Sequence, residues 1–133
     1  KDIMVSGSSI PKIKITSNIK EASSKITKYK LGLAIVMKKN VVAGILTDGD
    51  ARRSLRYNIK SQNLENIMTS NPVFISENST ASKALSVMNK KKITSLLVTP
   101  EKDLHHKNKK LVGIVHIHSI LQFGIKWVFE KKD

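Results

Sequence analysis

The sequence predicts an α/β (α+β) fold made of two copies of a β-α-β-β-α unit. The first observation is an internal repeat, in which residues 111–121 match residues 42–52 at a constant offset of 69. The second is a shorter match at an offset of 64, which carries Met4 to Met68. The third is that short β-branched runs alternate with stretches of helical periodicity. We expect the two units to pack face to face across their sheets, with pseudo-twofold symmetry and a shared core.

The first unit is expected to contain three strands and two helices. The strands are predicted over residues 11–15, 31–37 and 41–47, and the helices after a cap at Ser17 or Asn18 and over residues 48 to about 57. The first helix has one apolar stripe, because Ile19, Ala22 and Ile26 are spaced to fall on one face.

The second unit repeats this order. Its strands are predicted over residues 73–75, 93–99 and 111–116, and its helices after a cap at Ser79 and over residues 119 to about 124. The first of these helices has an apolar stripe at Ala81, Ala84, Leu85 and Met88. The loop over residues 100–110 is seven residues longer than its counterpart, since the repeat offset rises from 62 to 69 across it. We expect this loop to be exposed and mobile.

These repeats divide the chain into four parts. Residues 1–9 are the remnant of a linker, residues 10–62 and 63–125 are the two repeats, and residues 126–133 are a C-terminal tail. Because the chain begins with a motif that lies between elements in the second repeat, we expect it to come from a longer protein. Trp127, Val128 and Phe129 are too apolar for a free end, and we expect them to cover an interface or the partner repeat.

The composition narrows the class of protein. The chain has no cysteine and no apolar run near the ~18 residues that span a bilayer, which favours a cytoplasmic protein without a membrane segment. Its formal net charge is +14, but the lysines are scattered over every segment with few aromatic residues between them. Scattered lysine is typical of a solvated surface, so specific nucleic-acid binding is not expected.

A strand-to-helix corner is the first candidate site. An apolar strand ends at Thr47, and a polar turn with Asp48 and Asp50 opens a segment that contains Arg52 and Arg53. The N–H groups of a first helical turn have no partners inside the helix and, with two arginines nearby, suit a phosphate group. The alternative is an ordinary helix capped by Asp48 or Asp50, with both arginines in solvent. Both interpretations stay open on this stretch alone.

Three stretches resemble the C-terminal pair of CBS domains, the Bateman module, of bacterial arabinose 5-phosphate isomerases. They are Gly44-Ile45-Leu46-Thr47-Asp48-Gly49-Asp50-x-Arg52-Arg53, Ile93-Thr94-Ser95-Leu96-Leu97-Val98 and His116-x-His118-x-Ile120-Leu121-x-x-Gly124-Ile125. The likeness covers almost the whole chain. In these enzymes of lipopolysaccharide (Kdo) synthesis, the isomerase chemistry lies in a preceding sugar-isomerase domain, which has no counterpart here. The resemblance therefore implies a regulatory fragment without isomerase activity of its own.

The resemblance also implies a ligand. In CBS pairs the Thr and Asp of the strand-end motif commonly hold the phosphate and the ribose hydroxyls of a nucleotide, which maps to Thr47 and Asp50. The implied regulatory ligand is an adenine nucleotide or a nucleotide-activated sugar such as CMP-Kdo, and no cofactor is required. Asp48, Arg52 and Arg53 complete the candidate ligand-binding set of the first repeat.

The second repeat offers a different set of side chains. His116 and Ser119 stand where the first repeat has Thr and Asp, and Ser119 also departs from the isomerase family, which usually has Asp there. Thr94 and His118 are the other candidate ligand-binding residues of this repeat. Because a serine hydroxyl cannot accept two hydroxyls as a carboxylate can, we expect one strong nucleotide site in the chain, at the first corner.

No arrangement of residues indicates catalysis or a metal site. His116 and His118 share a face at a strand end, but no further ligands are evident, so we expect them to line the second cleft. Three functions stay open: a regulatory ligand-binding module, a structural module for oligomerisation without a ligand, and a polyanion-binding domain. The resemblance implies a homodimer, and a tetramer in the full-length protein.

Overall fold

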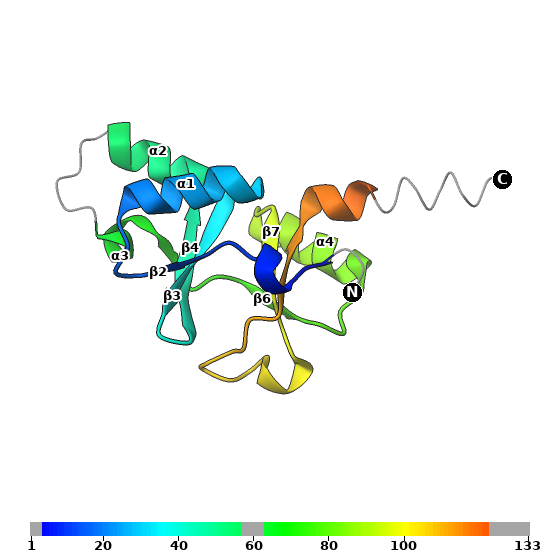
Figure 1. Ribbon diagram of the computed structural model, residues 1–133. Helices are drawn as coiled ribbons and strands as arrows, with labels where there is room; N and C mark the ends of the chain where they lie inside the picture. The colour runs from blue at the N-terminus through cyan, green and yellow to red at the C-terminus, as the bar shows by residue number, and fades with distance from the viewer. Residues whose placement is uncertain (1–3, 57–62, 123–133) are drawn as a thin grey trace. The chain divides into compact units, whose positions relative to one another are not determined.

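The computed structural model describes residues 4–56 and 63–122, which form two compact units (Figure 1). The first unit runs from Ser8 to Pro72, and the second combines residues 4–7 with the chain from Val73 onward. Each unit contains a four-stranded sheet and helices, so the predicted α/β class is confirmed. The face-to-face packing of the units, their shared core and the four sequence boundaries stay predictions.

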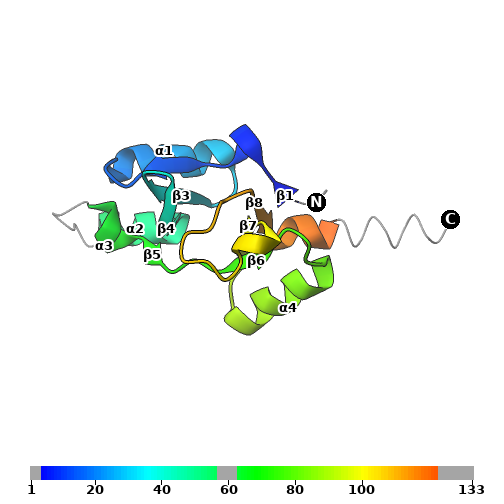
Figure 2. The ribbon, with the colours of Figure 1, turned by 90° about the horizontal axis from the view of Figure 1, so that it is seen from below.

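The first unit is a mixed sheet with two helices on one face. Its elements are β2 (Lys12–Lys14), α1 (Ile19–Tyr29), β3 (Leu33–Lys38), β4 (Val41–Thr47), α2 (Asp48–Arg56), α3 (Leu64–Ile67) and β5 (Thr69–Ser70). The strand order is β2-β3-β4-β5, in which β2 runs parallel to β3 and the other pairs are antiparallel. Helix α1 contacts β2, β3 and α2, and α2 contacts β4, so the two helices cover the sheet together (Figure 2).

The second unit repeats this arrangement. Its elements are β1 (Met4–Val5), β6 (Phe74–Ser76), α4 (Ala81–Lys91), β7 (Ser95–Thr99), β8 (Gly113–His116) and a helix over residues 117–122. The strand order is β1-β8-β7-β6, with only the β6–β7 pair parallel. The last helix begins two residues before its predicted start, directly after β8. The loop between β7 and β8 contains a 3₁₀ turn (Glu101–Asp103) and is largely exposed, as predicted.

The first helix of each unit begins at a side-chain cap. Asn18 Oδ1 accepts a hydrogen bond from the N–H of Glu21 at 2.8 Å, which confirms one of the two predicted caps of α1. The cap of α4 is Thr80, whose hydroxyl accepts from the N–H of Lys83 at 3.0 Å. The prediction of Ser79 is therefore wrong by one residue, because adjacent hydroxyl residues look equivalent in the sequence.

Each sheet has a fourth strand that the sequence analysis did not predict. Strand β5 pairs with β4 and β1 pairs with β8, in each case beside a glycine of the longer strand. A Cβ on Gly44 would lie 2.6 Å from the carbonyl oxygen of Thr69, and one on Gly113 would lie 2.9 Å from that of Val5. Strands of two residues are too short to show an alternation of polar and apolar residues, which is why β1 falls within the predicted linker.

Each unit has its own hydrophobic cluster between sheet and helices. The predicted stripes lie in these clusters: Ile19, Ala22 and Ile26 in the first unit, and Ala84 and Met88, with Ala81 and Leu85 packed against them, in the second. The predicted end of α2 at residue 57, the end of the last helix at residue 124 and the apolar tail at Trp127 lie outside the described residues. No helix within the described ranges is long and apolar enough to cross a membrane.

Candidate functional site

Reciprocal hydrogen bonds close the corner between β4 and α2. Thr47 is the last residue of β4, and α2 begins at the next residue. The Thr47 hydroxyl accepts from the N–H of Asp50 at 3.0 Å, while Asp50 Oδ2 accepts from the N–H of Thr47 at 3.0 Å. This is a capping box, which satisfies two backbone donors that the helix itself cannot pair. The N-cap is therefore Thr47, and the alternative of a cap at Asp48 or Asp50 is wrong.

The Asp50 carboxylate is buried and held from several sides. The residue is 7% exposed, and its Oδ1 pairs with the guanidinium of Arg53. Thr69, on β5, lies with its hydroxyl 3.5 Å from Oδ2. Because a carboxylate oxygen accepts about two hydrogen bonds, the contacts recorded among the described residues leave Oδ1 able to accept one more.

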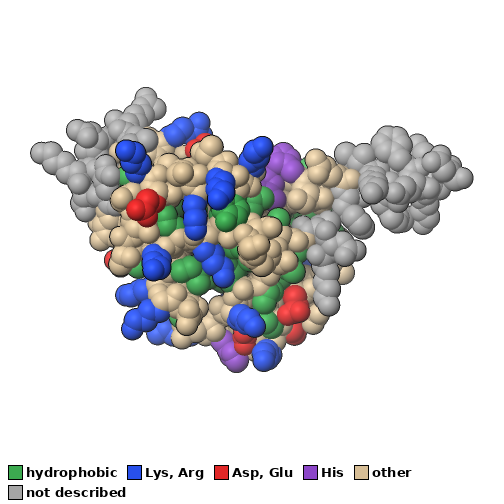
Figure 3. Space-filling view, in the orientation of Figure 1, with side chains coloured by type: hydrophobic (Ala, Val, Ile, Leu, Met, Phe, Trp, Pro, Cys, Tyr) green, Lys and Arg blue, Asp and Glu red, His purple; other side chains and the backbone are tan. Residues whose placement is uncertain are grey.

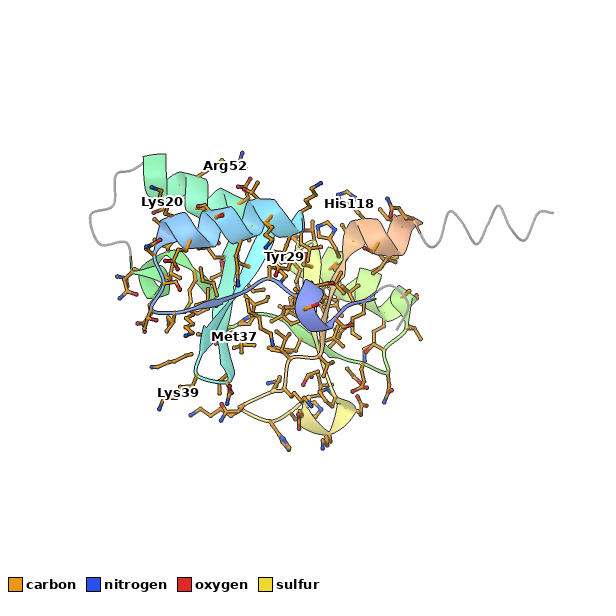
Figure 4. The ribbon with its side chains drawn as sticks, viewed as in Figure 1. Lys20, Tyr29, Met37, Lys39, Arg52 and His118 are labelled. Atoms are coloured by element: carbon orange, nitrogen blue, oxygen red, sulfur yellow. The ribbon has the colours of Figure 1, made fainter. Side chains whose placement is uncertain are left out.

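The two arginines take different positions. Arg52 lies on the outer side of α2 (Figure 4), with its side chain 75% exposed and Nη2 3.4 Å from Asp48 Oδ2. Arg53 contacts the buried Asp50 although most of its own side chain is in solvent. The structure thus brings Thr47, Asp50 and Arg53 together, and leaves Asp48 and Arg52 as an exposed ion pair beside them.

The equivalent corner of the second unit uses an imidazole as its cap. His116 is the last residue of β8, and its Nδ1 accepts from the N–H of His118 at 3.1 Å. The two rings stack with their centroids 4.8 Å apart. No side-chain hydrogen bond of Ser119 is recorded within the described part of the chain. This corner has a cap but no second acceptor that would complete a box.

His116 is biased toward its neutral form. Partial burial lowers the pKa of His116 below its usual 6.5, and the neighbouring His118 lowers it further by charge repulsion. Only a deprotonated Nδ1 can accept the His118 N–H. The second corner therefore presents a neutral acceptor, whereas the first presents a carboxylate with a guanidinium.

Within residues 4–56 and 63–122, no group of three or more His, Asp or Glu side chains could hold a metal ion.

Thr94 and Ser95 lie beside the second corner. The Thr94 carbonyl accepts the N–H of Ile117 at 2.8 Å, and Ser95 pairs with His116 across the sheet. The Ser95 hydroxyl has no hydrogen-bond partner among the described residues. Sequence reasoning missed Ser95 and Thr69 as site residues. Thr69 could not be found because its strand was not predicted. Ser95 is adjacent to the selected Thr94, but the sequence does not indicate which of the two side chains faces the corner.

The duplicated unit, with a capped helix directly after its last long strand, agrees with a known family. The sequence model of the CBS domain matches residues 1–57 and again residues 64–126. The chain belongs to the CBS-domain family. It carries a tandem CBS pair, which confirms the predicted resemblance.

Curated relatives of this CBS pair include arabinose 5-phosphate isomerases. The chain is 36% identical over 128 residues to arabinose 5-phosphate isomerase KdsD of Francisella tularensis, and 31% identical over 127 residues to KdsD of Escherichia coli. An uncharacterized protein of Rickettsia prowazekii is 34% identical over 126 residues. These alignments cover 93–95% of this chain but 37% of each relative. The CBS pair thus spans little more than a third of their length.

Three solved structures share the fold. The CBS pair of MJ0100, in complex with 5′-methylthioadenosine and S-adenosyl-L-methionine, has a TM-score of 0.79 at 24% identity, over 94% of both chains. CBSX2 in complex with AMP has a TM-score of 0.75 at 17% identity, also over 94% of both chains. AcuB of Vibrio cholerae has a TM-score of 0.82 at 16% identity, over 99% of this chain and 95% of that one. These similarities establish the fold.

Proposed function

We propose that this CBS pair is a regulatory module of an arabinose 5-phosphate isomerase and that its Thr47–Asp50 corner binds a nucleotide. The observation that carries the proposal is the Asp50 carboxylate, 7% exposed and held in place by Thr47 and Arg53. A fixed carboxylate at a helix start accepts hydroxyl groups of a ribose through charge-assisted hydrogen bonds. Asp50 is thus the ribose-binding residue.

Arg53 connects the ribose to the phosphate in this proposal. Its side chain is 64% exposed, so it is free to turn away from Oδ1 when a ribose hydroxyl takes its place. It then lies near the first turn of α2, where the helix dipole favours an anion. The Asp48 carboxylate at the same helix start disfavours a phosphate, but its ion pair with Arg52 offsets that charge.

The ligand class follows from the ribose. Methylthioadenosine, S-adenosylmethionine and AMP, named with two of the structural neighbours, all contain an adenosine ribose, and only AMP has a phosphate. An adenine nucleotide is therefore the first ligand to test. The isomerase relatives favour a nucleotide-activated sugar such as CMP-Kdo as the second.

One strong site per chain is expected. Hydrogen bonds to a charged partner contribute about 1.5–3 kcal/mol, against about 1 kcal/mol for neutral pairs. The neutral His116 and the Ser119 hydroxyl should therefore bind a nucleotide about tenfold more weakly than Thr47 and Asp50.

Calorimetry with AMP and with CMP at physiological salt tests the proposal. We expect about one site per chain, lost in Asp50→Ala and little changed in Ser119→Ala, which is the matched substitution at the equivalent position. Circular dichroism checks that both variants stay folded. Two equal sites, or full binding by Asp50→Ala, would contradict the proposal. Binding of no nucleotide would favour a structural module, and a steep salt dependence of DNA binding would favour a polyanion-binding domain.

The proposal extends to the whole protein, which is then a cytoplasmic isomerase with its catalytic domain outside this chain. The 133-residue chain should not convert ribulose 5-phosphate to arabinose 5-phosphate, and turnover above a mock-purified blank would show that the active site is misplaced. We also propose that two CBS pairs associate as a dimer. Light scattering that gives a monomer mass at micromolar concentrations would contradict this part.

A further inference from the structure

A second candidate site lies in the first unit, at the other end of its sheet. The site is a surface groove of about 480 Å³ between β2 and α1, lined by residues 12–14, Ser17, Glu21, Lys25 and Met37. The register of β3 and β4 sets Thr47 opposite Leu33, at the start of β3, whereas Met37 lies near the end of that strand. The groove is thus separate from the Thr47–Asp50 corner.

The backbone edge of β2 offers hydrogen-bond donors to this groove. Strand β2 is at the edge of its sheet, and the bonds from Ile35 N–H to the Pro11 carbonyl and from Ile15 N–H to the Met37 carbonyl fix which groups face β3. In a parallel pair the alternate residues point their N–H and C=O groups the other way, so those of Lys12 and Lys14 face outward.

The carbonyl groups of this edge are already in use. Lys12 O accepts from the Lys25 ammonium at 2.6 Å, and Lys14 O accepts from the N–H of Ser17 at 2.9 Å. The hydrogen bonds recorded among the described residues include no acceptor for the outward N–H groups of Lys12 and Lys14. An added β-strand needs both donors and acceptors, and each outward carbonyl of this edge already has a donor beside it, whereas the outward N–H groups have no recorded acceptor among the described residues. The geometry therefore suits an anion better than an extended peptide.

Charge narrows the kind of anion. The groove is lined by three lysines and one glutamate, and Figure 3 shows lysine and arginine side chains spread over the surface that α1 and β2 form. A net charge of about +2 matches a phosphate monoester, which carries about −1.5 to −2 at neutral pH, better than a single carboxylate. The Glu21 side chain takes part in none of the ion pairs recorded in the described ranges, so its carboxylate is available to accept hydroxyl groups.

We propose that this groove binds the phosphate monoester of a small hydroxylated molecule. The phosphate oxygens accept from the N–H groups of Lys12 and Lys14 and pair with the lysine ammonium groups. The hydroxyl groups of the ligand donate to Glu21, and Ile13 and Met37 are the apolar residues of the lining.

The second repeat lacks these side chains, so the charge of the groove is not a by-product of the fold. An offset of 62 carries Lys12, Lys14 and Lys25 to Phe74, Ser76 and Val87, and carries Glu21 to Lys83. There the Lys109 ammonium lies over the Phe74 ring, 5.6 Å from its centre, and the Ser76 hydroxyl accepts from the N–H of Asn78. The set of donors is specific to the first unit.

NMR titration of the ¹⁵N-labelled chain with ribose 5-phosphate tests the proposal. We expect the largest shifts at the amides of Lys12, Lys14 and Ser17. Lys25→Gln should weaken binding about two- to fivefold, as loss of one partly exposed ion pair does. Lys20→Gln removes the same charge from the same helix, but Lys20 does not line the groove and is the matched control (Figure 4).

Glu21→Gln gives a test of opposite sign. Removing the negative charge should strengthen the binding of inorganic phosphate, and should narrow the advantage of ribose 5-phosphate over inorganic phosphate. Shifts of equal size over all lysine-rich segments, equal effects of Lys20→Gln and Lys25→Gln, or no shift at millimolar ligand would each overturn the site. Ribose 5-phosphate also contains the ribose and the phosphate for which the Thr47–Asp50 corner is proposed, so the titration is repeated with Asp50→Ala. The shifts at Lys12, Lys14 and Ser17 should be the same in that variant, and their loss would assign the binding to the corner instead.

Discussion

In both units a long strand ends and a helix begins at the next residue, with the same backbone bond at the junction. The N–H of Asp48 donates to the Gly32 carbonyl at 3.0 Å, and the N–H of Ile117 donates to the Thr94 carbonyl at 2.8 Å. The side chains at these junctions differ. The first corner has a hydroxyl and a buried carboxylate in a closed box, and the second has a neutral imidazole beside a serine without a recorded partner.

This difference shows which part of a repeat is fixed by folding. The register of the two central strands next to the corner, the presence of a short edge strand and the start of the helix directly after the strand are common to both units. The polar residues at the junction are under a weaker structural constraint, since a threonine hydroxyl caps the helix in one unit and an imidazole caps it in the other. We infer that the two corners share one backbone arrangement and differ in what they bind.

The largest effect on stability is expected at the glycines against which the edge strands pack. Gly44→Ala would place a Cβ 2.6 Å from the Thr69 carbonyl oxygen, a backbone atom that cannot move without disturbing the β4–β5 pairing. Overpacking of this kind costs about 1–3 kcal/mol of unfolding free energy. Gly113→Ala should be at the lower end of that range, because the first atoms it meets belong to the flexible Met4 side chain. Urea denaturation measures both.

Gly49→Ala is the control for these two glycine variants. Its Cβ would meet Arg53 and Thr47 atoms at 3.5 and 3.7 Å, which are ordinary contacts, and the residue lies in α2. It should stabilise the protein by up to about 1 kcal/mol through helix propensity. If all three variants destabilised the protein equally, the close approach of the edge strands would not be the cause.

The next effect separates the two corners. Asp50→Ala should cost about 1–2 kcal/mol, because it leaves the partly buried N–H of Thr47 without its acceptor and removes the partner of Arg53. Ser119→Ala should change the unfolding free energy by less than about 0.5 kcal/mol. The same urea measurements test these two variants. Equal losses of unfolding free energy would show that Ser119 also takes part in a capping box, at the second corner.

The sequence was sufficient to predict most of the long elements. Strand β4 has the predicted limits, and the stripe of Ile19, Ala22 and Ile26 lies in the core, because periodicity over several residues reports which face is buried. Strands β1 and β5 were missed because two residues cannot show a period. The packing partners of Gly44 and Gly113 come from these strands, so their close contacts were also beyond sequence reasoning.

The candidate site was only partly predictable. The repeat identified Thr47 and Asp50 as a pair, but local sequence could not distinguish a capping box from a cap at Asp48 or Asp50, since both Thr and Asp cap helices. The separation of Arg52 from Arg53 depends on which face of α2 is turned toward Asp50, and adjacent residues of a helix point about 100° apart. Thr69 reaches Asp50 from a segment 19 residues away, and no local pattern reports such a contact.

A smaller effect should appear as a pH dependence of the second corner. The pKa of His116 is lowered in the folded state, so above pH 6.5 both states are neutral and stability is unaffected. As the pH falls below 6.5, the unfolded state binds the proton first, and the unfolding free energy declines until the folded pKa is reached. His116→Asn keeps a side-chain acceptor but does not titrate. The urea midpoint of this variant should therefore fall less than that of the wild type between pH 7.5 and pH 5.5.

His106, whose Nδ1 lies 3.3 Å from Asp103 Oδ1, is present in both proteins, so any contribution of this pair cancels in the comparison. The difference between wild type and His116→Asn thus isolates the corner. An unchanged pH profile would mean that His116 is protonated equally in both states.

The smallest effect on stability is expected at Arg52, and it sharpens the comparison of the two arginines. Its ion pair with Asp48 joins side chains that are 75% and 56% exposed, so solvent screening limits its contribution to about 0.3–0.5 kcal/mol. Arg53 pairs with a carboxylate whose side chain is 8% exposed, and Arg53→Gln should cost more than Arg52→Gln, because it leaves a buried charge without its cation. Urea midpoints measure the two variants side by side. If Arg52→Gln proved the more destabilising of the two, Arg52 would have to hold the helix start through a contact other than Asp48, and the division between an exposed pair and a buried cluster at this corner would be wrong.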